Sequence, residues 1–282
     1  MKTIDRRALF SSGAAAALLA ASGVSLEAAP HTGGRLRVAV PRDGVSLGRL
    51  VRGAAFDSLT EIAANGVLQG ELATGWSGNE NGRVWHFDLR DDVAFHNGAP
   101  MRAQDVVASL SGYAEMGRLR LRTIEATGVR AVRLELQEGD RGLPLRLADQ
   151  MFTICQDGHV DLSLAEAIGT GCYRTRRHEP DRGYLGQKVE QHYKDGRAGW
   201  ADSIEAVVIP DPAIRSEALR DGYVDIAVLP APEGLREQKD FIFHPSFSDM
   251  ALAARRSVGV PREIGANGPL DDGRLAERWW RV

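Results

Sequence analysis

Few residues in this sequence have the type and spacing that chemistry requires, and its two cysteines are the first to consider. Cys155 and Cys172 lie close together in the chain. In an oxidising compartment they could form a disulfide, which would add roughly 3 kcal/mol of stability by closing a short loop. Two buried free thiols are the alternative. No further cysteine stands at zinc-ligand spacing, so the sequence predicts no cysteine-based metal site.

Several motifs that are typical of hydrolytic enzymes, phosphate-binding proteins and redox enzymes are also absent. The chain contains no His-Glu-x-x-His helix, no phosphate-binding glycine-rich loop and no Cys-x-x-Cys pair. Its aspartates and glutamates are scattered, and their spacing selects no general acid and base. We therefore expect no catalytic residue, no metal site and no cofactor, with an enzyme as the weaker alternative.

The N-terminus is typical of an export signal. Lys2 and the pair Arg6–Arg7 form a basic start, and an apolar stretch rich in alanine and leucine runs from Gly13 to Val24. Adjacent arginines before such a stretch indicate the twin-arginine pathway. We expect residues 1–29 to be a signal peptide cleaved near Ala28 or Ala29, and the mature protein to be periplasmic. An uncleaved anchor or a core helix are the alternatives, although the stretch is short for a membrane span.

Composition and charge restrict the partners. The chain of 282 residues is 43% hydrophobic and 26% charged, which is ordinary for a soluble globular protein. Its net charge of -3 supplies no basic surface for nucleic acid. Small-molecule or peptide ligands are compatible with this balance.

Alternating and helical patterns predict the elements that must position a site. We expect strands at 35–40, 83–93, 129–136, 204–209 and 223–229, a helix over 47–62 and a helix opening at 103–105. The turn Asn79–Gly82 favours a hairpin before the second strand. Asp211 and Pro212 are typical of a helix start, and Asp221–Gly222 of a helix end. This strand–helix–strand unit predicts an α/β protein with a mixed or parallel sheet.

Several ordered motifs resemble one known family. Residues 71–110 read ELATGWSGNENGRVWHFDLRDDVAFHNGAPMRAQDVVASL. This stretch resembles the signature region of the family 5 extracellular solute-binding proteins, which serve peptide- and nickel-type ABC importers. The matching residues are Leu72, Ala73, Trp76, Trp85 through Arg90, Phe95, His96, Gly98, Pro100 and Asp105 through Val107. GGRLRVAV at 33–40, IGTGCYR at 168–174 and VVIPDPAIRSEALRDGYVDIAVL at 207–229 are similar to further segments of that family.

The resemblance implies an α/β fold of the type II periplasmic binding protein class, with a mixed β-sheet. Family members close two lobes on their ligand and are much longer than this chain. The ending GPLDDGRLAERWWRV is similar to the element that leads into the second lobe. We therefore expect residues 30–230 to form the solute-binding lobe and 231–282 to form a C-terminal extension. That extension would start a shortened second lobe, most of which is missing.

The family also implies structural roles for aromatic and histidine side chains. Trp76, Trp85 and Phe87 are expected in the core. His86 and His96 suggest a metal, since relatives bind nickel chelates, but His96 lies in a turn motif shared by members with different ligands. A turn hydrogen bond is therefore expected for it. The C-terminal pair Trp279–Trp280 is expected to pack back on the body rather than form an apolar patch.

In function, the resemblance implies a non-catalytic solute-binding component of an ABC importer for peptides or a related small solute. Its partner would be an ABC permease in the inner membrane. Ligands of open α/β sheets bind at strand ends, so the predicted contact residues are Arg42, Asp43, Gly171, Cys172 and Tyr173. The alternative is a one-lobed module that transports nothing and contacts another protein or a second copy through its exposed face.

Overall fold

The main sheet has seven strands. The computed structural model describes residues 30–230, 235, 239–245, 251–259 and 274–281, and the predicted signal peptide at 1–29 lies outside them. In spatial order the strands are β12 (Phe241–Pro245), β13 (Ala251–Arg255), β11 (Ile226–Leu229), β1 (Arg35–Val40), β10 (Ser203–Val208), β9 (Gly183–Lys188) and β8 (Tyr173–Glu179). β1 is parallel to β10 and β11, and every other pair is antiparallel. The predicted mixed sheet is confirmed.

The predicted strand–helix–strand unit forms around β1. Helix α5 (Pro212–Arg220) connects β10 to β11, and β1 lies between these two strands. Asp211 caps the helix by accepting a hydrogen bond from the Ala213 N–H at 2.8 Å. Gly222 follows the helix with φ of 81°, a left-handed conformation that glycine adopts without a Cβ clash.

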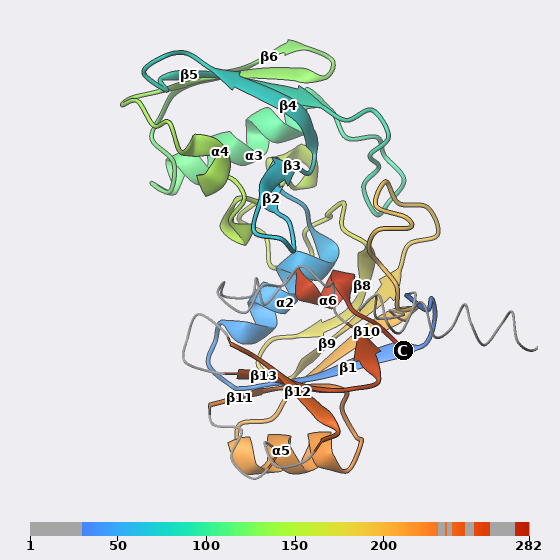
Figure 1. Cartoon of the computed structure of the whole chain (residues 1–282). Coiled ribbons are helices and arrows are strands. Elements are labelled where there is room, and N and C mark those ends of the chain that lie inside the picture. The colour runs from blue at the N-terminus through green and yellow to red at the C-terminus, as the bar shows by residue number, and fades with distance from the viewer. Residues whose placement is uncertain (1–29, 231–234, 236–238, 246–250, 260–273, 282) are drawn as a thin grey trace, which may run out of the picture. The chain divides into compact units, whose positions relative to one another are not determined.

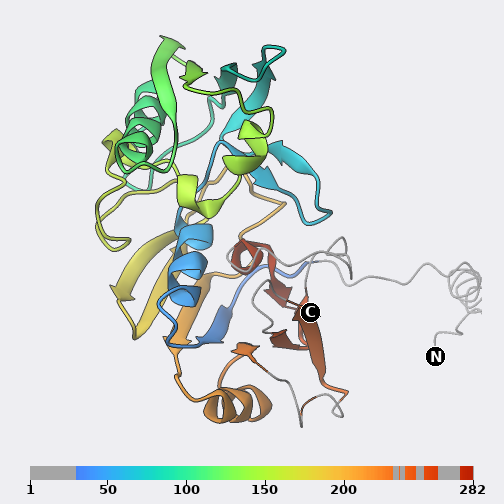
Figure 2. The same cartoon turned by 90° about the vertical axis from the view of Figure 1, so that its left-hand side faces the viewer.

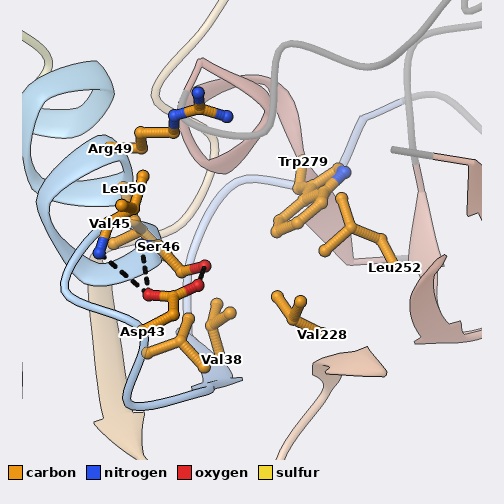
Figure 3. Close-up of a pocket in the computed structure, with 10 residues that line it drawn as sticks. Val38, Asp43, Val45, Ser46, Arg49, Leu50, Val228, Leu252 and Trp279 are labelled. Carbon is orange, nitrogen blue, oxygen red and sulfur yellow. Dashed lines mark hydrogen bonds between the residues drawn. The ribbon is translucent and has the colours of Figure 1, made fainter. Parts of the chain in front are cut away.

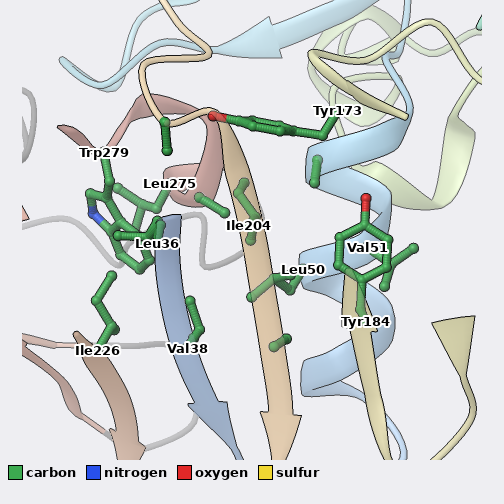
Figure 4. Packing of buried hydrophobic residues seen from close by; sticks show 14 of the residues in the cluster. Leu36, Val38, Leu50, Val51, Tyr173, Tyr184, Ile204, Ile226, Leu275 and Trp279 are labelled. Carbon is green, nitrogen blue, oxygen red and sulfur yellow. The ribbon is translucent and has the colours of Figure 1, made fainter. Parts of the chain in front are cut away.

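Helices cover both faces of this sheet (Figures 1 and 2). On one face lies α2 (Ser46–Ala55). Its residues Leu50 and Val51 share a core cluster with Leu36, Val38 and Val40 of β1. The intervening Ala39 points to the opposite face, where it packs in a cluster with Leu219 of α5. Figure 4 shows the first face closed by Trp279, which is 1% exposed and follows α6 (Leu275–Arg278). The expectation that this tryptophan packs back on the body is confirmed.

A second layer carries the tryptophan hairpin. Its sheet has the order β4 (Ala73–Gly78), β5 (Val84–Leu89), β7 (Ala131–Leu136) and β6 (Leu121–Gly128), with helix α3 (Ala103–Glu115) packed on one face. Phe87 is 0% exposed and Trp85 is 7% exposed, while Trp76 is half-buried against the same core. The hairpin and the structural role of its aromatic residues are confirmed.

The remaining elements of the described chain are short. They are β2 (Thr60–Ile62), β3 (Leu68–Gly70), α4 (Leu143–Arg146), the 3-10 turns η1 (Gln150–Phe152) and η2 (Gln156–Gly158), β14 (Val258–Gly259) and β15 (Trp280–Arg281). None of the helices in the described part of the chain has the length and apolarity that a membrane crossing needs. The segment predicted as a C-terminal extension supplies β12 and β13 to the main sheet, so the boundary placed at residue 230 falls within that sheet.

Two sequence expectations need correction. The helix predicted over 47–62 ends at Ala55, and Thr60–Ile62 instead pairs with β3. The His96 ring does not bond within its own turn: its Nε2 donates to the Gly171 carbonyl at 2.8 Å, joining two distant segments.

Of the two alternatives for the cysteines, the structure has the buried free thiols: Cys155 and Cys172 are unpaired and lie in different surroundings. Cys155 packs with Ala55 and Phe56. The Sγ of Cys172 lies 3.5 Å from His192 Nδ1 and 3.6 Å from Glu277 Oε2. Burial raises the pKa of the Cys155 thiol to about 11, so it carries little of the reactive thiolate.

Candidate functional site

A cavity of about 190 Å³ opens beside the carboxyl ends of β1 and β11. Its floor and one wall are apolar, and its other wall is the first turn of α2 with the loop before it. The lining residues are Val38, Val40, Asp43, Val45, Ser46, Arg49, Leu50, Val228, Leu252 and Trp279. In open α/β sheets this is the edge at which ligands bind, and a mostly apolar lining with a few polar groups is typical of small-molecule sites.

Asp43 organises the polar wall. Its Oδ1 accepts hydrogen bonds from the backbone N–H groups of Val45 and Ser46, at 2.9 and 2.8 Å, and its Oδ2 accepts the Ser46 hydroxyl at 2.6 Å. These bonds satisfy donors at the start of α2 that have no partner within the helix. Partial burial pushes the pKa of Asp43 upward, but the bonds from Ser46 and Val45 outweigh it and hold the pKa below its usual value. Asp43 is therefore ionised at neutral pH.

Arg49 supplies the positive charge on the same wall. It lies one turn after Val45 and Ser46, so helical spacing places the three side chains on one face. Figure 3 shows the Arg49 side chain along one edge of the cavity, Asp43 and Ser46 along another, and Trp279, Leu252 and Val228 across from them. Among the described residues, nothing forms a hydrogen bond or ion pair with the exposed Arg49 guanidinium.

The sequence-predicted contact residues separate into two groups. Asp43 lines the cavity, and Arg42 is exposed next to it in the loop after β1. Gly171, Cys172 and Tyr173 do not line the cavity, because they are buried in the core. At Gly171 a Cβ atom would lie 2.5 Å from the Ala55 carbonyl carbon, so this glycine permits close contact with the end of α2. The roles of all five in ligand binding remain predictions.

Other lining residues were not predicted from sequence. Val228 and Leu252 belong to β11 and β13, and Trp279 follows α6, so three distant segments meet here. Arg49 could have been predicted from the sequence, because the helical pattern after Asp43 places this charged residue in the first turns of the helix, near the end of β1. The pairing of β13 beside β11 had no comparable signal.

One sequence pattern that is typical of enzymes occurs in this wall of the cavity. Residues 44–48 read Gly-Val-Ser-Leu-Gly and match the Gly-x-Ser-x-Gly pattern of a serine nucleophile between a strand and a helix. A nucleophile needs an adjacent base, and no described histidine forms a hydrogen bond with Ser46. The Ser46 hydroxyl donates to Asp43 instead, and its backbone lacks a positive φ. The pattern here serves the start of α2.

A second polar centre is buried between the two layers. We call it the ionic cluster, and its members are Asp57, Glu61, Glu71, Lys194, Arg274, Glu277 and Arg278. Lys194 Nζ lies 2.6 Å from Glu71 Oε1, 3.1 Å from Glu277 Oε1 and 3.3 Å from Asp57 Oδ1. Arg274 contacts the same Glu71 oxygen, and Arg278 Nη2 lies 3.1 Å from Glu61 Oε2.

The charges of the ionic cluster nearly balance. Among the described residues it contains four carboxyl groups and three cationic side chains. Burial raises the pKa of Glu71 to about 8, despite the opposing effect of Arg274 and Lys194. Burial also lowers the pKa of Lys194, but Glu277, Glu61 and Glu71 outweigh it and raise the pKa well above its usual value. A proton retained on Glu71 at neutral pH removes the surplus negative charge.

The carboxyl groups of the ionic cluster could in principle hold a cation. One oxygen each from Glu61, Glu71 and Glu277 lies within 4.8 Å of the others. Lys194 and Arg274 already donate to these oxygens. The cluster is therefore an assembly of buried salt bridges, and its geometry gives no reason to add a metal.

Comparison with known proteins identifies related sequences. A family model described as "Bacterial extracellular solute-binding proteins, family 5 Middle" matches residues 67–250. The probable peptide ABC transporter periplasmic-binding protein y4tO of Sinorhizobium fredii is 24% identical over 261 residues, covering 81% of this chain and 49% of the relative. The HTH-type transcriptional regulator SgrR of Salmonella choleraesuis is 29% identical over 131 residues, covering 45% of this chain and 24% of the relative.

A solved structure gives the same fold. The periplasmic binding protein AgaA from A. tumefaciens R10, in complex with agropinic acid, superposes with a TM-score of 0.67 at 22% identity, covering 75% of this chain and 48% of that one. The chain thus spans about half the length, or less, of the relatives it matches. The family match includes the tryptophan hairpin and the strand–helix–strand unit, and it covers well over half of the sequence. This chain belongs to family 5 of the bacterial extracellular solute-binding proteins.

Proposed function

We propose that this chain is the periplasmic solute-binding component of an ABC-type importer and that it captures peptides or a related small solute. The cavity at the carboxyl ends of β1 and β11 carries the proposal, because it combines an apolar lining with three polar side chains at the usual ligand-binding edge. The family supports solute binding, and one relative is named as a peptide ABC transporter binding protein. In this proposal residues 1–29 direct twin-arginine export, and an inner-membrane permease receives the solute.

The cavity assignment can be tested with a blocked variant. Val228 is a half-buried β11 residue in the cavity lining, and Val228→Phe would add a ring to that space. Val207→Phe is the matched control, since Val207 lies on β10, is 38% exposed and does not line the cavity. The purified chain and both variants would be screened by thermal shift against peptides, nickel chelates and sugars.

A ligand present at about 100 times its Kd adds about 2.7 kcal/mol, which raises the melting temperature by roughly 5–10 °C. We expect such a shift in the unmodified chain and in Val207→Phe, and a much smaller one in Val228→Phe. Equal shifts in all three proteins would contradict binding in this cavity.

A second candidate function is supported by a specific relative. SgrR is named as a transcriptional regulator, yet it is 29% identical to this chain over 131 residues. A family 5 domain could therefore bind a solute as a module that serves another protein instead of a transporter. Uptake of the identified ligand by cells that lack this chain decides between the two. Lost uptake supports transport, and unchanged uptake supports the module.

A further inference from the structure

The two charged side chains of the cavity, Asp43 and Arg49, differ in the number of hydrogen bonds that they form with the rest of the protein. Asp43 accepts three hydrogen bonds at the start of α2, and the positive end of the helix dipole further offsets its charge. Arg49 is exposed at the cavity and has no hydrogen-bonding or ionic partner among the described residues. The site therefore has a positive group without a partner and a negative group that is already engaged.

The opposite wall limits the rest of the ligand. Val228, Leu252 and Trp279 offer only apolar surface across from Arg49 (Figure 3). The cavity volume of about 190 Å³ is close to that of engineered apolar cavities of about 150 Å³ that hold benzene. A branched chain of five or six carbons, or a single ring, is about the largest apolar group that this space accommodates.

We infer that the cavity binds a small monocarboxylate with a branched or single-ring apolar body, and that Arg49 pairs with its carboxylate. The inference rests on the proposed function, since it specifies the solute for the same cavity. A guanidinium binds a carboxylate through two parallel N–H···O bonds, which fixes the orientation of the ligand. Asp43 repels a carboxylate at its own edge of the cavity, so the acid group is directed to Arg49 and the apolar body to Trp279.

Titration calorimetry with a matched pair of ligands tests this inference. 4-Methylpentanoate and 4-methylpentanamide have the same shape, but only the first carries a charge. We expect the acid to bind the full chain at least about tenfold more tightly than the amide, as expected for a charge-assisted hydrogen-bonded pair. In Arg49→Gln the two affinities should become equal. In Arg52→Gln, which removes the same charge one turn further along α2 but outside the cavity lining, the preference for the acid should remain.

The outcomes separate this inference from the proposed function. Equal binding of acid and amide to the unmodified chain, or an acid preference that survives in Arg49→Gln, would overturn the role of Arg49 and leave a neutral solute in the cavity. Binding of neither compound would also overturn the inference. The proposed function would then stand only if another solute gave a thermal shift that Val228→Phe removes.

Discussion

The ionic cluster and the cavity both contain charged side chains, but these differ in burial and in pairing. In the ionic cluster every charged group is buried and surrounded by partners of opposite sign. At the cavity the charges are solvent-accessible, and Arg49 has no described partner. Buried charges are stable only when paired, so the cluster has little freedom to accept a ligand, whereas the cavity retains capacity for one.

The two regions also hold different parts of the chain together. Lys194, Arg274 and Arg278 pair with carboxyl groups from the segment 57–71, and Lys194 also pairs with Glu277 near the C-terminus. The cavity is formed where β1, β11, β13 and α2 converge. We therefore expect substitutions in the cluster to change stability and substitutions at the cavity to change binding.

The largest effect is expected for Lys194→Met. It removes the cation that lies within 3.5 Å of Asp57, Glu61, Glu71 and Glu277, and the carboxyl groups remain buried. Breaking a buried ion pair in this way costs about 3–5 kcal/mol of the free energy of unfolding, which urea denaturation measures. Lys188→Met is the control: its nearest acidic partner is 4.0 Å away in a half-buried position, so a loss below about 1 kcal/mol is expected. Similar losses in both variants would contradict the special role of the cluster.

The next effect concerns pH and Glu71. In the unfolded chain this carboxyl loses its proton near 4.5, but in the folded protein its pKa is about 8. The folded state thus binds more protons between these values, so the free energy of unfolding falls as the pH rises toward 8. Burial lowers the pKa of His96 and of His178 below their usual value of 6.5. These two histidines therefore make the free energy of unfolding rise with pH, but only up to about pH 6.5. The range from 6.5 to 8 therefore isolates Glu71 from these two histidines.

Urea denaturation of Glu71→Gln at several pH values checks this sign. The variant cannot ionise at this position, so its stability should be nearly constant over the range in which the unmodified protein loses stability. Glu61→Gln is the comparison, because its carboxyl has a pKa lowered to about 2 and is already ionised there. An unchanged decline in Glu71→Gln would show that another group titrates.

Local patterns predicted much of the fold. Asp211, Pro212 and Gly222 mark the ends of α5 through backbone geometry that a few neighbouring residues determine. The helix predicted over 47–62 was too long because Leu59 and Ile62 continue the helical spacing. In the structure this segment leaves the helix after Ala55, pairs with β3 and directs Asp57 and Glu61 to Lys194. Tertiary contacts outweigh local preference there.

The candidate site was predictable only where it follows the chain locally. Asp43 was expected because it comes directly after β1, whereas Leu252 and Trp279 reach the cavity through strand order and helix packing. The ionic cluster could not be predicted, since Lys194 is separated from Glu71 by 123 positions in the sequence. No periodicity connects residues at that separation.

A smaller effect is expected for Asp43→Ala, which removes the acceptor of three hydrogen bonds at the start of α2. Loss of such a cap typically costs about 1 kcal/mol. Asp43→Asn keeps an acceptor oxygen and removes the charge, so it should recover most of this stability in urea denaturation. If Asp43→Asn were as unstable as Asp43→Ala, the charge rather than the hydrogen bonds would support the helix.

The smallest effect on stability is expected for Arg49→Gln. An exposed side chain without a described partner contributes little to the folded state, so the free energy of unfolding should change by less than about 0.5 kcal/mol. Lys194→Met and Arg49→Gln each remove one positive charge, and the comparison of the two regions requires very different outcomes for them. A loss above about 1 kcal/mol in Arg49→Gln would mean that this guanidinium is already engaged by the protein. The charge available for a ligand's carboxylate would then have to lie elsewhere in the cavity.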